Sequence, residues 1–82
     1  MYKITKNNKE LKQGTLKEVM YYFLSIESNI YYALASKGYK ILKDNEIIQL
    51  TSDEQNHFEY DYKKDLHIKR VNKIKEIIKE LN

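Results

Sequence analysis

The stretch that decides the fold runs from residue 15 to residue 37, between two glycines, and reads TLKEVMYYFLSIESNIYYALASK. At about 100° per residue its apolar side chains share one face, which is typical of a helix packed on a core. Those side chains are Leu16, Val19, Met20, Phe23, Ile26, Ile30 and Leu34. Thr15 and Glu18 have the spacing of a capping box, so we expect the helix to begin at Thr15. Gly38 is expected to end the helical stretch.

Residues 15–37 fit either one long helix or two shorter ones. Ser25, Ser28 and Asn29 lie within five residues of one another, and such side chains favour caps and turns over helix interiors. We therefore expect a break at residues 24–27, with Ser28 as the N-cap of a second helix. A single uninterrupted helix to Lys37 is the alternative.

Strands are expected on both sides of this helical stretch. Residues 2–6 alternate between apolar and polar side chains before Asn7-Asn8, which predicts a hairpin. Residues 39–43 and 46–50 flank Asp44-Asn45, a two-residue loop whose members tolerate positive φ. The sequence therefore predicts two hairpins, one before the helical stretch and one after it.

The rest of the chain is interpreted as one more strand and a final helix. Residues 57–62 alternate strictly, which predicts a strand with Phe58, Tyr60 and Tyr62 on one face. Asp65 is expected to cap a helix with a heptad-like apolar spacing, carried by His67, Val71, Ile74, Ile78 and Leu81. We expect one small α+β domain over residues 1–82, with an N-terminal hairpin, a helix-turn-helix or one long helix, a three-stranded antiparallel sheet and a C-terminal helix.

Composition argues against most enzyme and membrane classes. The chain has no Cys and only two Gly, so a thiol nucleophile and a glycine-rich phosphate loop are excluded. His57 and Glu59 are too few for a metal site, and we expect no metal, no cofactor and no catalysis. With no signal peptide and no apolar run of about 20 residues, we expect a cytoplasmic protein with no membrane partner.

Read as two helices, residues 18–34 resemble the helix-turn-helix of small DNA-binding proteins common in phages and mobile elements of AT-rich bacteria. Such proteins often place Gly-Thr and a Glu-Val pair at the start of the first helix, and open the recognition helix with Ser and a branched apolar residue. The matching residues are Gly14, Thr15, Glu18, Val19, Ser28, Asn29 and Ile30. The resemblance implies a regulatory DNA-binding protein without enzymatic activity.

The resemblance also implies which residues would contact DNA. Those that would approach bases are Asn29, Tyr31, Tyr32 and Ser36, and those that would approach phosphates are Lys37 and Lys40. Lys43 is expected to add phosphate affinity. An Asn amide can pair with adenine in the major groove, and hydroxyls can bond phosphates.

The alternative is a small mobile-element inhibitor, of the anti-defence or anti-CRISPR kind, that binds a protein or nuclease target. Tyr, Ser and Asn together are typical of binding surfaces, and here they are Tyr21, Tyr22, Ser25, Ser28 and Tyr32. A variant of this hypothesis uses acidic strands, through Asp44, Glu46, Glu59 and Asp61. We expect the heptad-like stripe of the last helix to pack in the core, with a homodimer through that helix as the alternative.

Overall fold

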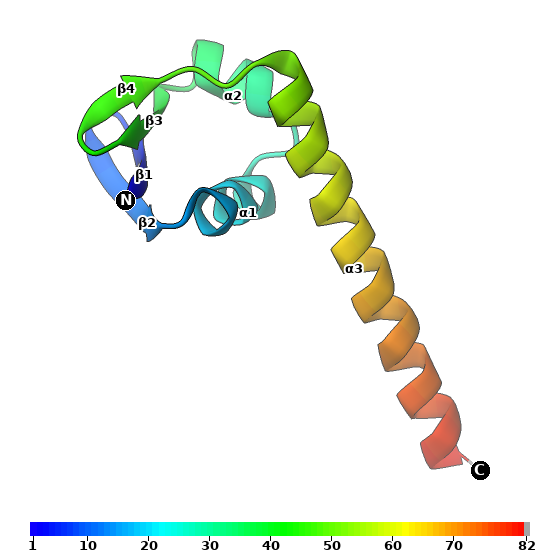
Figure 1. Cartoon of the computed structure of the whole chain (residues 1–82). Helices are drawn as coiled ribbons and strands as arrows, with labels where there is room; N and C mark the ends of the chain where they lie inside the picture. Colours follow the sequence, from blue (N-terminus) through cyan, green and yellow to red (C-terminus); the bar gives the residue numbers. More distant parts are fainter. Residues whose placement is uncertain (82) are drawn as a thin grey trace.

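The structure, a computed structural model, describes residues 1–81. Its centre is a four-stranded antiparallel sheet (Figure 1). The strands are β1 (Tyr2–Lys6), β2 (Lys9–Gly14), β3 (Tyr39–Lys43) and β4 (Glu46–Ile48). Their order is β2-β1-β3-β4, and pairing of β1 with β3 places Ile4 opposite Ile41. The two predicted hairpins are therefore parts of one sheet, which the sequence analysis had not joined.

Both hairpins turn in two residues whose backbone is left-handed. In the first turn Asn7 has φ of 51° and Asn8 has φ of 67°. In the second turn Asp44 has φ of 50° and Asn45 has φ of 68°. Two successive positive φ values suit the right-handed twist of the paired strands, and Asn and Asp adopt them readily. The two predicted hairpins are confirmed, although β4 ends two residues earlier than the predicted strand over 46–50.

The helical stretch forms two helices, α1 (Leu16–Ile26) and α2 (Ile30–Ser36). The capping box is confirmed, because the Glu18 N–H donates to Thr15 Oγ1 at 3.1 Å and the Thr15 N–H donates to Glu18 Oε1 at 3.3 Å. The break falls at residues 27–29, slightly later than expected. The N-cap of α2 is Asn29 and not Ser28, since Asn29 Oδ1 accepts the Tyr32 N–H at 3.0 Å.

The predicted strand over residues 57–62 is wrong, because this segment belongs to α3 (Ser52–Leu81). The helix begins thirteen residues before the predicted cap at Asp65, because a second capping box lies at its start. The Glu54 N–H donates to Thr51 Oγ1, and the Thr51 N–H donates to Glu54 Oε1, both at 3.1 Å. Residues four apart share one side of a helix. Phe58 and Tyr62 therefore lie on one side of the helix, whereas Tyr60, expected on the same face, lies on the other side and is exposed.

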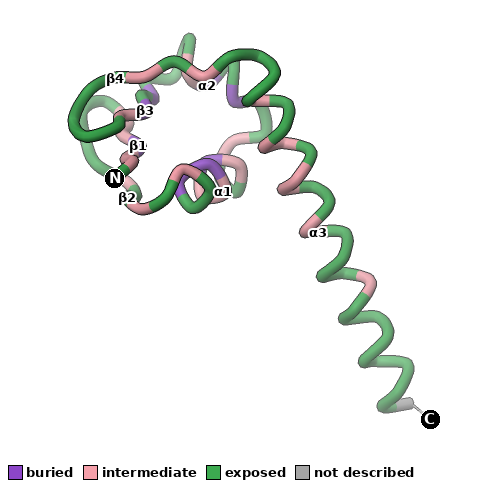
Figure 2. The backbone as a smooth tube through the Cα atoms, viewed as in Figure 1, coloured by how far each residue is buried: buried purple, intermediate pink, exposed green. Residues whose placement is uncertain are grey.

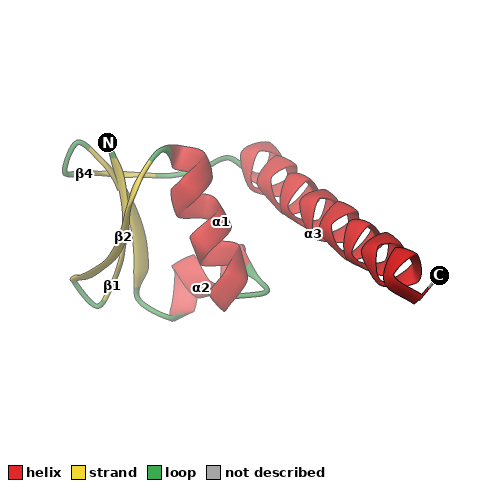
Figure 3. Ribbon diagram, turned by 90° about the horizontal axis from the view of Figure 1, so that it is seen from below, coloured by secondary structure: helices red, strands yellow, loops and turns green. Residues whose placement is uncertain are grey.

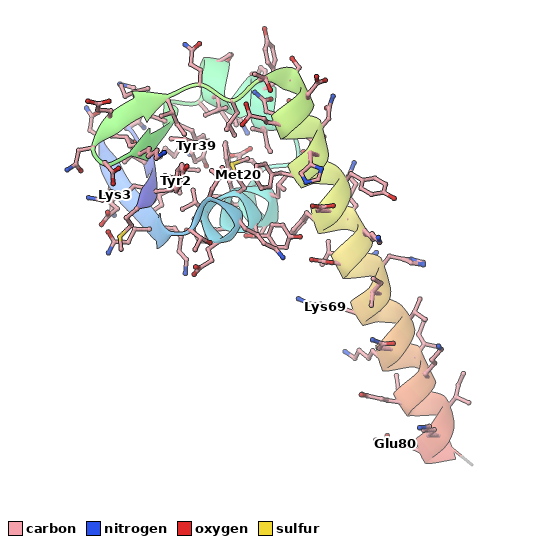
Figure 4. All side chains as sticks on the ribbon, in the orientation of Figure 1. Tyr2, Lys3, Met20, Tyr39, Lys69 and Glu80 are labelled. Atoms are coloured by element: carbon pink, nitrogen blue, oxygen red, sulfur yellow. The ribbon has the colours of Figure 1, made fainter. Side chains whose placement is uncertain are left out.

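The core lies between the sheet and the two short helices (Figure 3). Met20 from α1 and Tyr39 from β3 project into this space (Figure 4). The buried residues are Ile4, Val19, Met20, Phe23, Ile30, Ala33, Tyr39 and Ile41. Ile26 was expected on this face but is exposed, because the chain leaves the helix there.

α3 contacts α1 through its first half and then leaves the domain (Figure 2). All residues from Asn72 to Glu80 are exposed, so the expected packing of the heptad-like stripe in the core is wrong for Ile74 and Ile78, and the side chain of Leu81 lies outside the described part. The projecting helix makes the molecule long, with principal extents of 53 × 22 × 20 Å. Within residues 1–81, no helix is both long enough and apolar enough to cross a bilayer.

Candidate nucleic-acid interface

α2 exposes two tyrosines while it anchors itself in the core. Ile30 and Ala33 are fully buried, whereas Tyr31 and Tyr32 are 73% and 55% exposed. Tyr32 and Ser36 are four residues apart and therefore share one side of α2. Tyr31 lies about 100° further around the helix. The structure thus brings Tyr32 and Ser36 together and separates Tyr31 from them.

Asn29 is engaged as a helix cap. Its side-chain oxygen accepts the Tyr32 N–H at 3.0 Å, and this satisfies one of the free donors at the start of α2. Reading an adenine takes both the oxygen and the nitrogen of an Asn amide. A two-point base contact by Asn29 would therefore require the cap to open, which the sequence analysis did not anticipate.

Lys37, directly after α2, is held by Glu27 from the break between the helices. Lys37 Nζ lies 2.8 Å from Glu27 Oε2, and the Tyr39 hydroxyl donates to Glu27 Oε1 at 3.0 Å. The hydrogen bond from Lys37 lowers the pKa of Glu27, and the same contact raises the pKa of Lys37. Lys37 Nζ also lies 5.9 Å from the centre of the Tyr32 ring. Glu27 therefore fixes the ammonium group of Lys37 beside the exposed face of α2.

The β1–β2 turn lies beside the end of α2, a proximity that the sequence analysis missed. The Asn7 N–H donates to the Gly38 carbonyl at 3.0 Å. Lys6 and Lys9 flank this turn and pair with each other across the hairpin. Lys6 Nζ lies 5.1 Å from the ring centre of Tyr39. Pairing of β1 with β3 therefore brings the turn that Lys6 and Lys9 flank to the end of α2. We call Tyr32, Ser36, Lys37, Lys6 and Lys9 the α2 face.

The two other predicted phosphate contacts lie further along β3. Lys40 is exposed between the buried Tyr39 and Ile41, and it borders a groove beside α2. Lys43 lies at the far end of the strand, 5.7 Å from the ring centre of Tyr2. Three residues of strand separate the two lysines by about 10 Å. Lys40 is thus close to α2, whereas Lys43 belongs to the opposite end of the sheet.

Tyr21, assigned to the alternative protein-binding face, lies inside the contact between α1 and α3. Its hydroxyl donates to Asp65 Oδ2 at 2.7 Å, and its ring meets the Tyr62 ring edge-on with centres 5.4 Å apart. The hydrogen bond to Asp65 raises the pKa of Tyr21 to about 12. Tyr22 is half-buried against the core, and the Ser25 hydroxyl donates to its carbonyl at 2.6 Å. These contacts tie three of the proposed binding residues into the domain itself.

The acidic residues are divided between two elements and do not form a surface of strands. Asp44 lies in the β3–β4 turn, 2.9 Å from the N-terminal ammonium group, which lowers the pKa of Asp44. Glu46 follows on β4. Glu59 and Asp61 lie on α3, where Asp61 Oδ2 is 3.2 Å from His57 Nε2. The hypothesis of one acidic face built by strands is therefore wrong in its geometry.

Two grooves border Tyr31. One, of about 380 Å³, runs between α2 and β4 and is lined in part by Leu34, Ile47 and Leu50. The other, of about 430 Å³, lies where the break before α2 meets α3, and Ser28, Asn29 and Glu59 line it. Glu59 places negative charge near the N-terminus of α2, whereas the lysines gather at its C-terminus.

In the described part of the chain, no three His, Asp or Glu side chains come close enough together to hold a metal ion. Comparisons with known protein families, curated proteins and solved structures found no match to the chain.

Proposed function

We propose that the protein is a non-enzymatic DNA-binding regulator of the phage or plasmid type, with α1 and α2 as a helix-turn-helix. The observation that carries the proposal is the α2 face: Tyr32 and Ser36 share one side of α2, Lys37 lies near the Tyr32 ring, and the turn flanked by Lys6 and Lys9 bonds to Gly38 just after α2. The three-residue break before α2 supports it, because an uninterrupted helix would have left no separate recognition element.

In this proposal hydroxyls and ammonium groups have different tasks. Tyr32 and Ser36 present hydroxyls that can bond base edges or phosphates, while the lysines supply charge for the DNA backbone. Glu27 keeps Lys37 in place and offsets part of its charge, and Lys6 also interacts electrostatically with Glu27. Four phosphate contacts correspond to a slope of roughly −3.6 in log affinity against log salt.

The test is the anisotropy of labelled random duplex DNA, titrated with protein over a series of salt concentrations. Lys40→Ala and Lys9→Ala should each reduce the salt slope by about 1 and weaken binding on all sequences alike. Lys12→Ala is the matched control, because Lys12 is exposed on the same strand as Lys9 but lies three residues further from the β1–β2 turn, opposite Ile4. An absence of binding at low salt, or an equal loss in all three variants, would refute the proposal.

Base contact is tested separately from phosphate contact. Selection from a random pool should yield a preferred site, and Ser36→Ala or Tyr32→Phe should reduce the preference for that site by about 1–3 kcal/mol. Asn29→Ala is unsuitable for this purpose, because it also removes the cap of α2. Equal weakening on preferred and random sequences would place these hydroxyls on phosphates only.

A second candidate is a small inhibitor that binds a protein target, and it is supported by a different tyrosine. Tyr31 and Ile47, at 73% and 61% exposure, stand on the two sides of the groove between α2 and β4. Exposed aromatic and aliphatic side chains beside a groove are typical of protein contact sites. Affinity capture that fails with Tyr31→Ala but succeeds with Tyr32→Ala would favour the inhibitor, and the reverse dependence of DNA binding would favour the regulator.

A further inference from the structure

The free half of α3 carries an apolar stripe with nothing from the described domain on it. The stripe consists of Val71, Ile74, Ile77 and Ile78, and the three isoleucines are 47–56% exposed. Spacings of three and four residues place all four on one side of the helix. An isoleucine-rich side in water is unfavourable by the hydrophobic effect, so this side has the composition of a contact surface.

The stripe faces away from the domain to which α3 belongs. Phe58, Tyr62 and Asp65 mark the side of α3 that meets the domain. Rotation of about 100° per residue places the stripe on average about 160° from that side. Lys69, which lies on the opposite side of the helix from the stripe, projects toward the domain side in Figure 4. The domain therefore cannot cover the stripe without unwinding α3, and a partner can approach it unobstructed.

Three of the four charged residues next to the stripe are cationic. Lys75 borders the edge of the stripe at Val71, Lys73 borders the edge at Ile77, and Arg70 lies between Ile74 and Ile77 around the helix. Glu80, three residues after Ile77, is the one acidic neighbour, and Glu76 lies on the far side of the helix. An apolar stripe between two cationic borders is complementary to an apolar seam between two acidic ones. The charges that border the stripe therefore favour a partner with negative charge beside its apolar seam.

A second copy of the same helix fits this surface poorly. With Val71 and Ile78 at a positions and Ile74 at d, Arg70 occupies a g position and Lys75 an e position. A parallel pair would place Arg70 of one chain against Lys75 of the other, and the antiparallel register that pairs Ile74 with Ile78 would bring the two Lys75 side chains together. The stripe also covers fewer than the three to four heptads of a sustained coiled coil.

We propose that this stripe docks an amphipathic helix of a partner protein, whose apolar seam is bordered by Asp or Glu. The inference is independent of the α2 face, because it concerns a different element and a different kind of ligand. Arg70 and Lys75 select the acidic partner, and the isoleucines supply the buried contact. The partner lies along the outer side of α3 and leaves the exposed side of α2 free.

The test uses two designed helical peptides of about three heptads, with Leu at the seam and either Glu or Lys at every bordering position. The labelled peptides are titrated with the full chain and binding is followed by anisotropy. We expect the acidic peptide to bind at least about tenfold more tightly than the basic one, with the difference decreasing at high salt. Equal affinity for both peptides would overturn the proposal.

Three variants locate the binding. Ile74→Gln should abolish binding of the acidic peptide, and Arg70→Gln should weaken it several-fold. Lys69→Gln is the matched control, since it removes the same charge one residue away on the domain side of α3. Circular dichroism checks that each variant keeps its helix content. Equal effects of Arg70→Gln and Lys69→Gln would contradict the assigned border.

Two further measurements distinguish the proposed partner helix from a second copy of the chain and from a lipid surface. Sedimentation velocity of the chain alone, and flotation with vesicles of anionic phospholipid, are run on the natural chain and on Ile74→Gln. Self-association or vesicle binding that is lost in Ile74→Gln would overturn the proposal in favour of a second copy or of a lipid surface. A monomeric chain that does not bind vesicles and does bind the acidic peptide supports the proposal.

Discussion

Tyr21→Phe removes the hydroxyl that ties α1 to α3 and leaves the ring contact in place. A hydrogen bond to a charged group contributes roughly 1.5–3 kcal/mol, but Asp65 is only half-buried and water can replace part of that contact. We therefore expect a loss of about 1 kcal/mol in the free energy of unfolding. The edge-on contact with Tyr62 needs only the ring, so the variant should retain it.

The assay is urea denaturation followed by circular dichroism, which resolves a change of this size in a domain whose total stability is of the order of 4–12 kcal/mol. Tyr22→Phe is the neighbouring control, because Tyr22 packs on the core by its ring. In a double-mutant cycle with Asp65→Ala, the coupling energy should also be about 1 kcal/mol. Equal losses for the two tyrosine variants, or no coupling to Asp65, would refute the reasoning.

The same hydrogen bond makes stability depend on pH. The folded state raises the pKa of Tyr21 from 10.0 to about 12, because the protonated hydroxyl donates to Asp65. The contribution is therefore fully present below pH 10.0 and is lost as pH rises toward 12. The stability difference between the natural chain and Tyr21→Phe should be constant from neutral pH to about pH 9 and should shrink above pH 10. An unchanged difference up to pH 12 would contradict the assignment.

Three further substitutions test the core, a cap and a turn by the same denaturation assay. Phe23→Ala should cost about 3–5 kcal/mol and leave little folded protein, because Phe23 is fully buried; a loss below 1 kcal/mol would contradict its place in the core. Asn29→Ala should cost about 1 kcal/mol whereas Asn29→Asp should cost less, since a carboxylate can also cap α2. Gly38→Ala should destabilise by at least about 1 kcal/mol, because Gly38 has φ of 77° and an added Cβ would collide with the Asn7 side chain; Asn7→Gly in the same chain should restore part of the loss.

Turns and helix starts could be predicted from the sequence, because they depend on residues close together in the chain. Asn7-Asn8 and Asp44-Asn45 are residues that accept positive φ, and both form the expected two-residue turns. Thr15 and Glu18 cap α1 as their spacing predicts. The coarse α+β class with a C-terminal helix follows from these signals.

The wrong prediction of a strand at residues 57–62 also arose from local sequence spacing. Phe58 and Tyr62 fit a strand with period two, yet they are also four apart and so fit one side of a helix. Thr51 and Glu54 repeat the capping box of Thr15 and Glu18, and they decide in favour of the helix. The spacing was present in the sequence and should have outweighed a six-residue alternation.

Parts of the candidate interface depend on pairing between distant segments, which no local pattern reveals. Lys6 comes near α2 only because β1 pairs with β3, in a register that places Lys6 opposite Tyr39. Tyr21 lies opposite the apolar side of its own helix and looked available to a partner, but α3 meets it there. Its true partner, Asp65, lies 44 residues away in the sequence.

The position of the core along the chain has a consequence for synthesis. Every residue in the core falls between Ile4 and Ile41, within the first half of the sequence. A nascent chain therefore has its whole core available before most of α3 has left the ribosome, and domains begin to fold from the N-terminal side during synthesis. α3 then forms from contacts between near neighbours, which are quick to establish. We therefore expect vectorial folding, in which the helix that is translated last is added to a domain whose fully buried residues are already in place.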